Sequence, residues 1–215
     1  MGAIARSAAN NITTSGVFTS SAITNSSVTG ITVLANASDG ITFISSQTAS
    51  NSASLSFTSG LNGTYKAYKF VLPNIHPRTD DVQFEFNLST DGGSNYNVTK
   101  TTTYFRAYNL EGGGSEALEY HTPSDLAQST SNQRIMGGLG NGADESGAGT
   151  LTLFNPSSTT YVKHFIATAN SYFSNDYMTV QHVAGYGNTT SAVNAVRFQM
   201  SSGNFDGTIY MYGIK

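Results

Sequence analysis

Residues 82–88 alternate strictly between apolar and polar side chains, with apolar residues at 82, 84, 86 and 88. Successive side chains of a β-strand point to opposite faces, so this period of two predicts a strand with one buried face. The pattern stops at Asp91, Gly92 and Gly93. Asp and Gly tolerate the positive φ angles of a hairpin turn, so we expect the strand to end in such a turn.

Similar short runs recur along the chain, separated by Gly, Asn, Asp and Ser. Besides 82–88, the predicted strands are 41–46, 53–57, 65–75, 100–109, 117–121, 132–137, 149–154, 161–172, 178–186, 193–200 and 207–213. The best helix signal is a single turn over 124–128, after Pro123. About a dozen short strands predict an all-β chain, specifically an antiparallel β-sandwich of jelly-roll type.

Two connections follow from the same pattern. The strands 161–172 and 178–186 are joined by a short Ser-Asn-Asp segment, which is typical of a turn between neighbouring strands. The strand 207–213 alternates almost to the last residue. We expect it to be paired inside a sheet, because an unpaired strand would be an aggregation-prone edge.

Residues 1–40 differ from the rest, because single apolar residues stand in a nearly uncharged background of Ser, Thr and Asn. Such a segment cannot bury enough apolar area to fold alone. Two interpretations remain open: a flexible tail, or an extended arm that orders against other copies or an assembly partner. The regular spacing of β-branched residues favours the arm, followed by a sandwich domain at 41–215. The expected arm contacts are Ile12, Val17, Phe18, Ile23, Val28 and Ile31.

Charge and composition exclude several classes of protein. Only 11% of residues are charged, the net charge is −3, and Lys and Arg do not cluster. Nucleic acids and anionic membranes are bound through basic patches, so neither is an expected partner. The chain has no Cys, which removes disulfides, thiolate metal ligands and Cys nucleophiles. We find no signal peptide and no apolar stretch long enough to span a membrane, so we expect synthesis in a cytoplasm.

Motifs for catalysis or metal binding are also missing. The four histidines, at positions 76, 121, 164 and 182, lack metal-ligand spacing, although two of them fall on neighbouring predicted strands. No G-x-S-x-G elbow occurs, and the carboxylates lie in or beside predicted loops. The oxygen-rich loop 141–145 lacks a calcium-loop pattern, so an ordinary polar turn is favoured. We predict no catalytic residue, no metal and no cofactor.

Aromatic residues gather beside the Gly-rich loop 110–116, and they are the candidates for a contact surface. The residues are Tyr104, Tyr108, Tyr120 and His121. Tyrosine supplies amphipathic contact area at a low entropic cost, which suits both glycans and protein surfaces. The alternative is that strand alternation places half of these residues in the core.

Several short segments occur in a characteristic order between residue 41 and the last residue. They include Ile44-Ser-Ser-Gln-Thr-Ala-Ser, Phe57-Thr-Ser-Gly-Leu-Asn-Gly-Thr-Tyr, Asn74-Ile-His-Pro, Leu153-Phe-Asn-Pro and Gly207-Thr-Ile-Tyr-Met-Tyr-Gly-Ile-Lys. In this order they resemble a family of virion structural proteins of tailed bacteriophages, namely the tail-fibre-like proteins of marine and freshwater phages. The resemblance implies a trimeric β-sandwich on the virion surface, without catalytic residues.

The residues and the resemblance together lead us to expect a non-enzymatic virion protein. It would be a tail-fibre or spike subunit, anchored to other virion proteins by residues 1–40. Its sandwich would face outward and contact a host-surface glycan or protein. Two alternatives stay open: a capsid decoration or head-fibre protein, and a carbohydrate-active enzyme domain.

Overall fold

The computed structural model describes residues 40–215, which form one compact unit. The predicted arm contacts therefore lie outside the described residues. The elements are β1 (Ile41–Ser52), β2 (Ser54–Phe57), β3 (Ala67–Pro77), β4 (Val82–Ser89), β5 (Lys100–Leu110), β6 (Glu116–Tyr120), the short 3₁₀ turn η2 (Thr122–Ser124), β7 (Gln133–Leu139), β8 (Gly147–Phe154), β9 (Lys163–Phe173), β10 (Tyr177–Gly187), β11 (Ala195–Met200) and β12 (Phe205–Ile214). Every predicted strand is present, and all pairs are antiparallel. The predicted all-β antiparallel class is confirmed.

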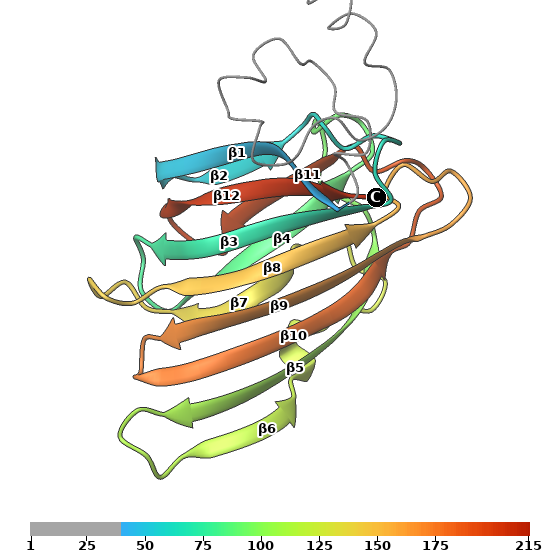
Figure 1. Cartoon of the computed structure of the whole chain (residues 1–215). Coiled ribbons are helices and arrows are strands. Elements are labelled where there is room, and N and C mark those ends of the chain that lie inside the picture. The colour runs from blue at the N-terminus through green and yellow to red at the C-terminus, as the bar shows by residue number, and fades with distance from the viewer. Residues whose placement is uncertain (1–39) are drawn as a thin grey trace, which may run out of the picture. The chain divides into compact units, whose positions relative to one another are not determined.

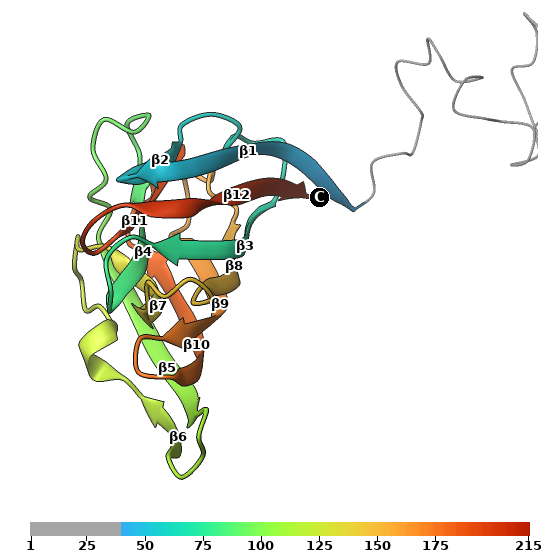
Figure 2. The same cartoon turned by 90° about the vertical axis from the view of Figure 1, so that its left-hand side faces the viewer.

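The twelve strands belong to one hydrogen-bonded sheet that consists of two runs. The eight-strand run has the order β1-β12-β3-β8-β9-β10-β5-β6, and the four-strand run has the order β7-β4-β11-β2. A single pair of residues, Leu139 of β7 and Phe173 of β9, joins the two runs. Figures 1 and 2 show the four-strand run against one face of the eight-strand run, with β5 and β6 extending beyond it.

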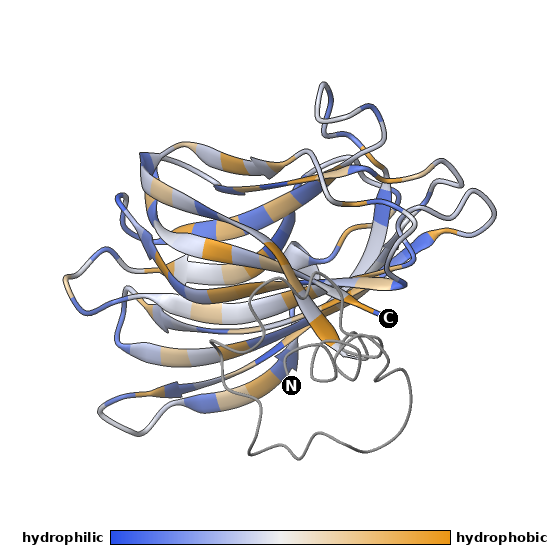
Figure 3. Cartoon of the chain, turned by 45° about the horizontal axis from the view of Figure 1, so that its top comes forward, coloured by the Kyte–Doolittle hydropathy of each residue, from blue (hydrophilic) through white to orange (hydrophobic). Residues whose placement is uncertain are grey.

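An aromatic cluster fills the space between the two runs. Phe198 of β11 is its centre, with ring centroids 5.3 Å from Phe70 of β3 and 5.9 Å from Phe84 of β4. A second bridge is the edge-to-face pair of Phe86 in β4 and Phe165 in β9, at 5.0 Å. All five rings are buried. Figure 3 shows that hydropathy alternates along the strands. Side chains two residues apart share a face, so this alternation places the buried rings on the inner face.

Polar side chains fill the remaining interior, under β5, β9 and β10. The buried polar residues in this part are Lys100, Thr102, Gln133, Lys163, Ser171, Thr179 and Gln181. Two pairs among them bond to each other: the Thr102 hydroxyl donates to Gln133 Oε1 at 2.7 Å, and Gln181 Nε2 donates to Ser171 Oγ at 3.0 Å. The interior is therefore apolar at one end and hydrogen-bonded at the other.

The predicted connections have mixed outcomes. The last strand, β12, lies between β1 and β3, so the prediction that it is paired inside a sheet is confirmed. The turn joining β9 and β10 is also confirmed, since these strands pair along their whole length. Gly92 and Gly93 have positive φ angles, but the predicted hairpin is wrong, because β4 pairs with β7 and β11 rather than β5.

Helical structure is minimal among the described residues. The predicted turn over 124–128 is misplaced: the observed 3₁₀ turn covers Thr122–Ser124 and contains Pro123. Proline fits the first turn of a helix, where its missing N–H leaves no bond unmade. No helix in residues 40–215 has the length and apolar character needed to cross a membrane.

Candidate ligand pocket

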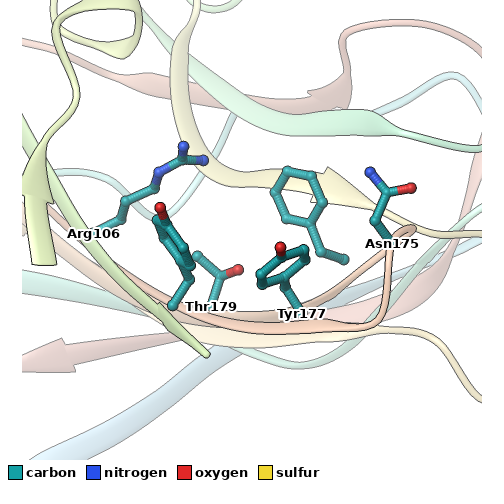
Figure 4. Close-up of a pocket in the computed structure, with 6 residues that line it drawn as sticks. Arg106, Asn175, Tyr177 and Thr179 are labelled. Atoms are coloured by element: carbon teal, nitrogen blue, oxygen red, sulfur yellow. The ribbon is translucent and has the colours of Figure 1, made fainter. Parts of the chain in front are cut away.

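A pocket opens on the inner face of β5 and β10, where the four-strand run no longer covers the sheet. Its volume is about 190 Å³, and its lining residues are Arg106, Tyr108, Phe173, Asn175, Tyr177 and Thr179. We call this the aromatic pocket. Arg106 lies at one side and Asn175 at the other, with Tyr177 between them (Figure 4). Three different elements meet here: β5, the end of β9 with its following turn, and the start of β10.

Strand register explains why these side chains converge. Tyr108 pairs with Thr179, and Tyr177 pairs with Phe173, so all four point to the same face of adjacent strands. The rings of Tyr108 and Tyr177 pack edge to face, with centroids 5.6 Å apart. The turn between β9 and β10, in which Asp176 has a φ of 61°, carries Asn175 to the rim.

Arg106 is fixed from two sides. Its Nε donates to Glu119 Oε1 of β6 at 2.7 Å, and its guanidinium lies 5.4 Å from the ring centroid of Tyr108. Glu119 is directly opposite Arg106 in the β5–β6 register. Among residues 40–215 no other ion pair involves Arg106. The pocket therefore has a positioned guanidinium, aromatic faces, and hydroxyl and amide groups around a small space.

The predicted contact residues do not form one surface. Tyr104 is only 1% exposed and belongs to the core, so its expected role as a contact residue is wrong. Tyr108 lines the aromatic pocket. Tyr120 is 52% exposed and pairs with Phe105, on the opposite face from Tyr108. Its hydroxyl donates to Asp125 at 2.6 Å.

His121 lies against the buried Tyr104 ring rather than in the aromatic pocket, at a centroid distance of 5.8 Å. Burial, reinforced by the nearby charges of Arg106 and Arg134, lowers the pKa of His121. Its Nδ1 is 2.7 Å from the hydroxyl of Ser124, which also accepts a bond from Arg134 at 2.8 Å. In the described residues no carboxylate is bonded to this His, so the pair lacks the third member of a catalytic triad and stabilises the turn after β6.

Among the described residues, the other histidines and the oxygen-rich loop are not arranged as a metal site. His164 pairs with Tyr186 and His182 with Thr168, so these two residues of β9 and β10 are displaced along the strands and do not meet. In the loop 141–145, the carboxylate of Glu145 accepts a bond from the backbone N–H of Gly142. Nowhere within residues 40–215 do three His, Asp or Glu side chains gather as a metal site would require.

The outer face of the sheet carries a second feature, a set of large exposed apolar side chains. Those on β5, β6, β9 and β10 are Phe105, Leu118, Tyr120, Ile166 and Met178. Leu118 is 74% exposed. Large apolar side chains exposed on one face of a sheet occur at assembly contacts, so this outer apolar face is a candidate protein interface.

Sequence reasoning found Tyr108 but missed the other pocket residues. The sequence does contain an indication of the pocket, because the aromatic residues Phe173 and Tyr177 flank the Ser-Asn-Asp turn. These two aromatic residues could be placed beside Tyr108 only by knowing that β10 pairs with β5.

Comparison with protein-family models, with curated proteins and with solved structures gave no match.

Proposed function

We propose that the chain is a non-enzymatic structural protein of a tailed-bacteriophage virion that binds a saccharide of the host surface in the aromatic pocket. The observation that carries this proposal is the pocket itself. Sugar rings have an apolar face and a rim of hydroxyls, so they fit a tyrosine-lined space with a guanidinium and an amide at its edge. The resemblance to tail-fibre-like virion proteins supports the same conclusion.

The proposal also covers the layering of the strands, the role of residues 1–40 and the oligomeric state. The two runs act as the two layers of a jelly-roll-like β-sandwich, and residues 1–40 act as the anchoring arm. The active form is a trimer on the virion surface, with the aromatic pocket facing outward. The all-β fold of residues 40–215 and the apolar outer face support this arrangement, because that face offers contact area to other copies.

An enzymatic alternative fits the pocket less well. Glycoside hydrolysis requires two carboxyl groups on either side of the scissile bond. No Asp or Glu lines the aromatic pocket, and the adjacent Glu119 is bonded to Arg106. A binding role needs only the groups that are present.

Saccharide binding can be tested with the full chain on a microarray of bacterial surface saccharides. We expect binding to one class of saccharide, and a loss of at least about tenfold in affinity for Tyr108→Ala and for Tyr177→Ala. The matched control is Tyr161→Ala, since Tyr161 is 70% exposed and outside the aromatic pocket. Equal binding by all three variants would contradict the assignment of the pocket.

The second candidate is a capsid decoration or head-fibre protein, and the outer apolar face favours it. Immunogold labelling of virions that contain the protein distinguishes the two locations. Label at the tail tip supports the fibre, whereas label over the head with none at the tail supports decoration. In the second case Leu118→Glu is expected to prevent attachment to the shell, because it places a charge in the apolar contact.

A further inference from the structure

The surroundings of Lys100 disfavour the charged form of its amine. Its side chain is fully buried between β4 and β5. Its Nζ donates to Asn87 Oδ1 at 2.6 Å and to the carbonyl of Val98 at 2.8 Å, and both acceptors are neutral. Within residues 40–215, no carboxylate lies within ion-pair distance of this amine. A buried ammonium without a counter-charge is strongly unfavourable, so the amine is favoured in its neutral form.

Asn87 presents its carbonyl group to this amine in a fixed orientation. The side chain is 2% exposed, and its Nδ2 donates to Thr130 O and Asn132 Oδ1, each at 3.0 Å. Two acceptors at Nδ2 identify that atom as the amide nitrogen. Oδ1 accepts from the backbone N–H of Leu88 at 2.9 Å in addition to Lys100. Donors on a carbonyl oxygen polarise the bond and stabilise negative charge that develops there.

We propose that Lys100 and Asn87 react with each other to form an intramolecular isopeptide bond. The carbonyl carbon is about 1.2 Å from Oδ1, so a small side-chain movement brings the Lys100 nitrogen onto it. The lone pair of neutral Nζ attacks this carbon, and the C–Nδ2 bond breaks. One proton passes from Nζ to the leaving nitrogen, and ammonia departs. No oxidant, reductant or cofactor is required.

The surroundings also keep the amine neutral and hold the amide in place. Burial lowers the pKa of Lys100 to about 7, so much of the amine is neutral and nucleophilic at physiological pH. Asn132 connects Asn87 to Glu85, because its Nδ2 lies 3.3 Å from Glu85 Oε2. Asn132 Oδ1 accepts from Asn87 Nδ2, so we assign Glu85 as a positioning residue that orients the Asn87 amide through Asn132.

A second buried lysine provides an internal comparison. Lys163 of β9 and Lys100 of β5 both pair with Gly187 of β10, so they flank the same residue. Lys163 Nζ donates to the backbone carbonyls of Tyr161, at 2.6 Å, and Thr189, at 3.1 Å. Neither partner has a side-chain amide to lose as ammonia. The reaction is therefore specific to Lys100, and it ties the four-strand run to the eight-strand run.

Intact-mass spectrometry of the purified full chain tests the proposal directly. We expect a mass about 17 Da below that of the sequence, which corresponds to one lost ammonia. Asp91 is the only acidic residue between the two partners. Cleavage before Asp91 is therefore expected to give two peptides that stay joined through Lys100 and Asn87. An unchanged mass after prolonged incubation at pH 9, where the amine is neutral, would overturn the proposal.

Two variants test which side chains form the isopeptide bond. Asn87→Ala is expected to show its full sequence mass and to be cut by trypsin after residue 100, whereas Lys163→Arg is expected to keep the loss of about 17 Da. Loss of the mass difference in Lys163→Arg, or its persistence in Asn87→Ala, would contradict the assignment. Glu85→Gln is expected to reduce the linked fraction after a short expression period by about tenfold. An unchanged fraction would remove Glu85 from the mechanism.

Discussion

The carboxylate of Asp91 illustrates how local hydrogen bonds decide the properties of single residues. It accepts from the backbone N–H of Asn95 at 2.9 Å, from the Ser89 hydroxyl at 2.7 Å and from the Asn95 side-chain amide at 2.7 Å. These bonds, led by the backbone N–H of Asn95, lower the pKa of Asp91 to about 2. Each favours the ionised form. The sequence indicated only a turn at this position, since donors from four residues away depend on the folded loop.

Asp91 is expected to make the stability depend on pH in a defined window. Its pKa is depressed in the folded state, so its contribution is present above the ordinary value of 3.8 and is lost as pH falls toward about 2. Urea unfolding between pH 2 and pH 6 measures this change. Asp91→Asn is expected to lower stability at pH 6 and to flatten the profile in that window. The control Asp144→Asn replaces an exposed acid and should leave the profile unchanged.

At the scale of strands, alternation predicts where elements occur but not which face is inside. All twelve strands were predictable because each follows a local pattern and ends at turn residues. In β5, however, the polar residues Lys100 and Thr102 point inward and Phe105 points outward. The interior under β5 is hydrogen-bonded, and its partners in β7 and β10 are distant in sequence. The aromatic pocket was not predictable either, because its residues also meet through the pairing of strands that are distant in sequence.

The joint between the two runs depends on Gly138 in β7. It has a φ of 56°, and a Cβ atom there would lie 1.8 Å from the ring of Phe173. Gly138→Ala is therefore expected to destabilise the protein by about 3 kcal/mol, because both the backbone and the packing are strained. Denaturant unfolding measures the loss. In the control Gly112→Ala, nothing lies within 4 Å of the new atom, and we expect a change below about 0.5 kcal/mol.

For the whole molecule, one aromatic cluster holds the two runs together. Phe198 contacts rings from β2, β3 and β4, at centroid distances between 5.3 and 6.5 Å. The sequence identified Phe84 and Phe86 as members of a buried face, but the pairing of β11 with β4 was not predictable from local patterns. Non-local pairing is decided by the fit of complete faces rather than by neighbouring residues.

Removal of the Phe198 ring is expected to destabilise the packing of both runs. Phe198→Ala is expected to cost about 3–5 kcal/mol of unfolding free energy, because it leaves a cavity in a fully buried cluster. Phe105→Ala serves as the control, since Phe105 is 44% exposed on the outer face. We expect it to change stability by less than about 1 kcal/mol. Similar losses in both variants would mean that the outer face contributes to folding as much as the core does.

The order of strands also has a consequence for how the chain folds. β1 pairs with β12, as in the register Ile41 with Ile214, and β2 pairs with β11, as in Phe57 with Val196. On a ribosome, β1 and β2 must therefore wait on the order of ten seconds for their partners to be synthesised. Their uncharged, Ser-rich and Thr-rich sequences keep these early strands from being strongly apolar during the wait. Folding that depends on such distant pairs is slow, so the finished fold is reached late rather than built up strand by strand.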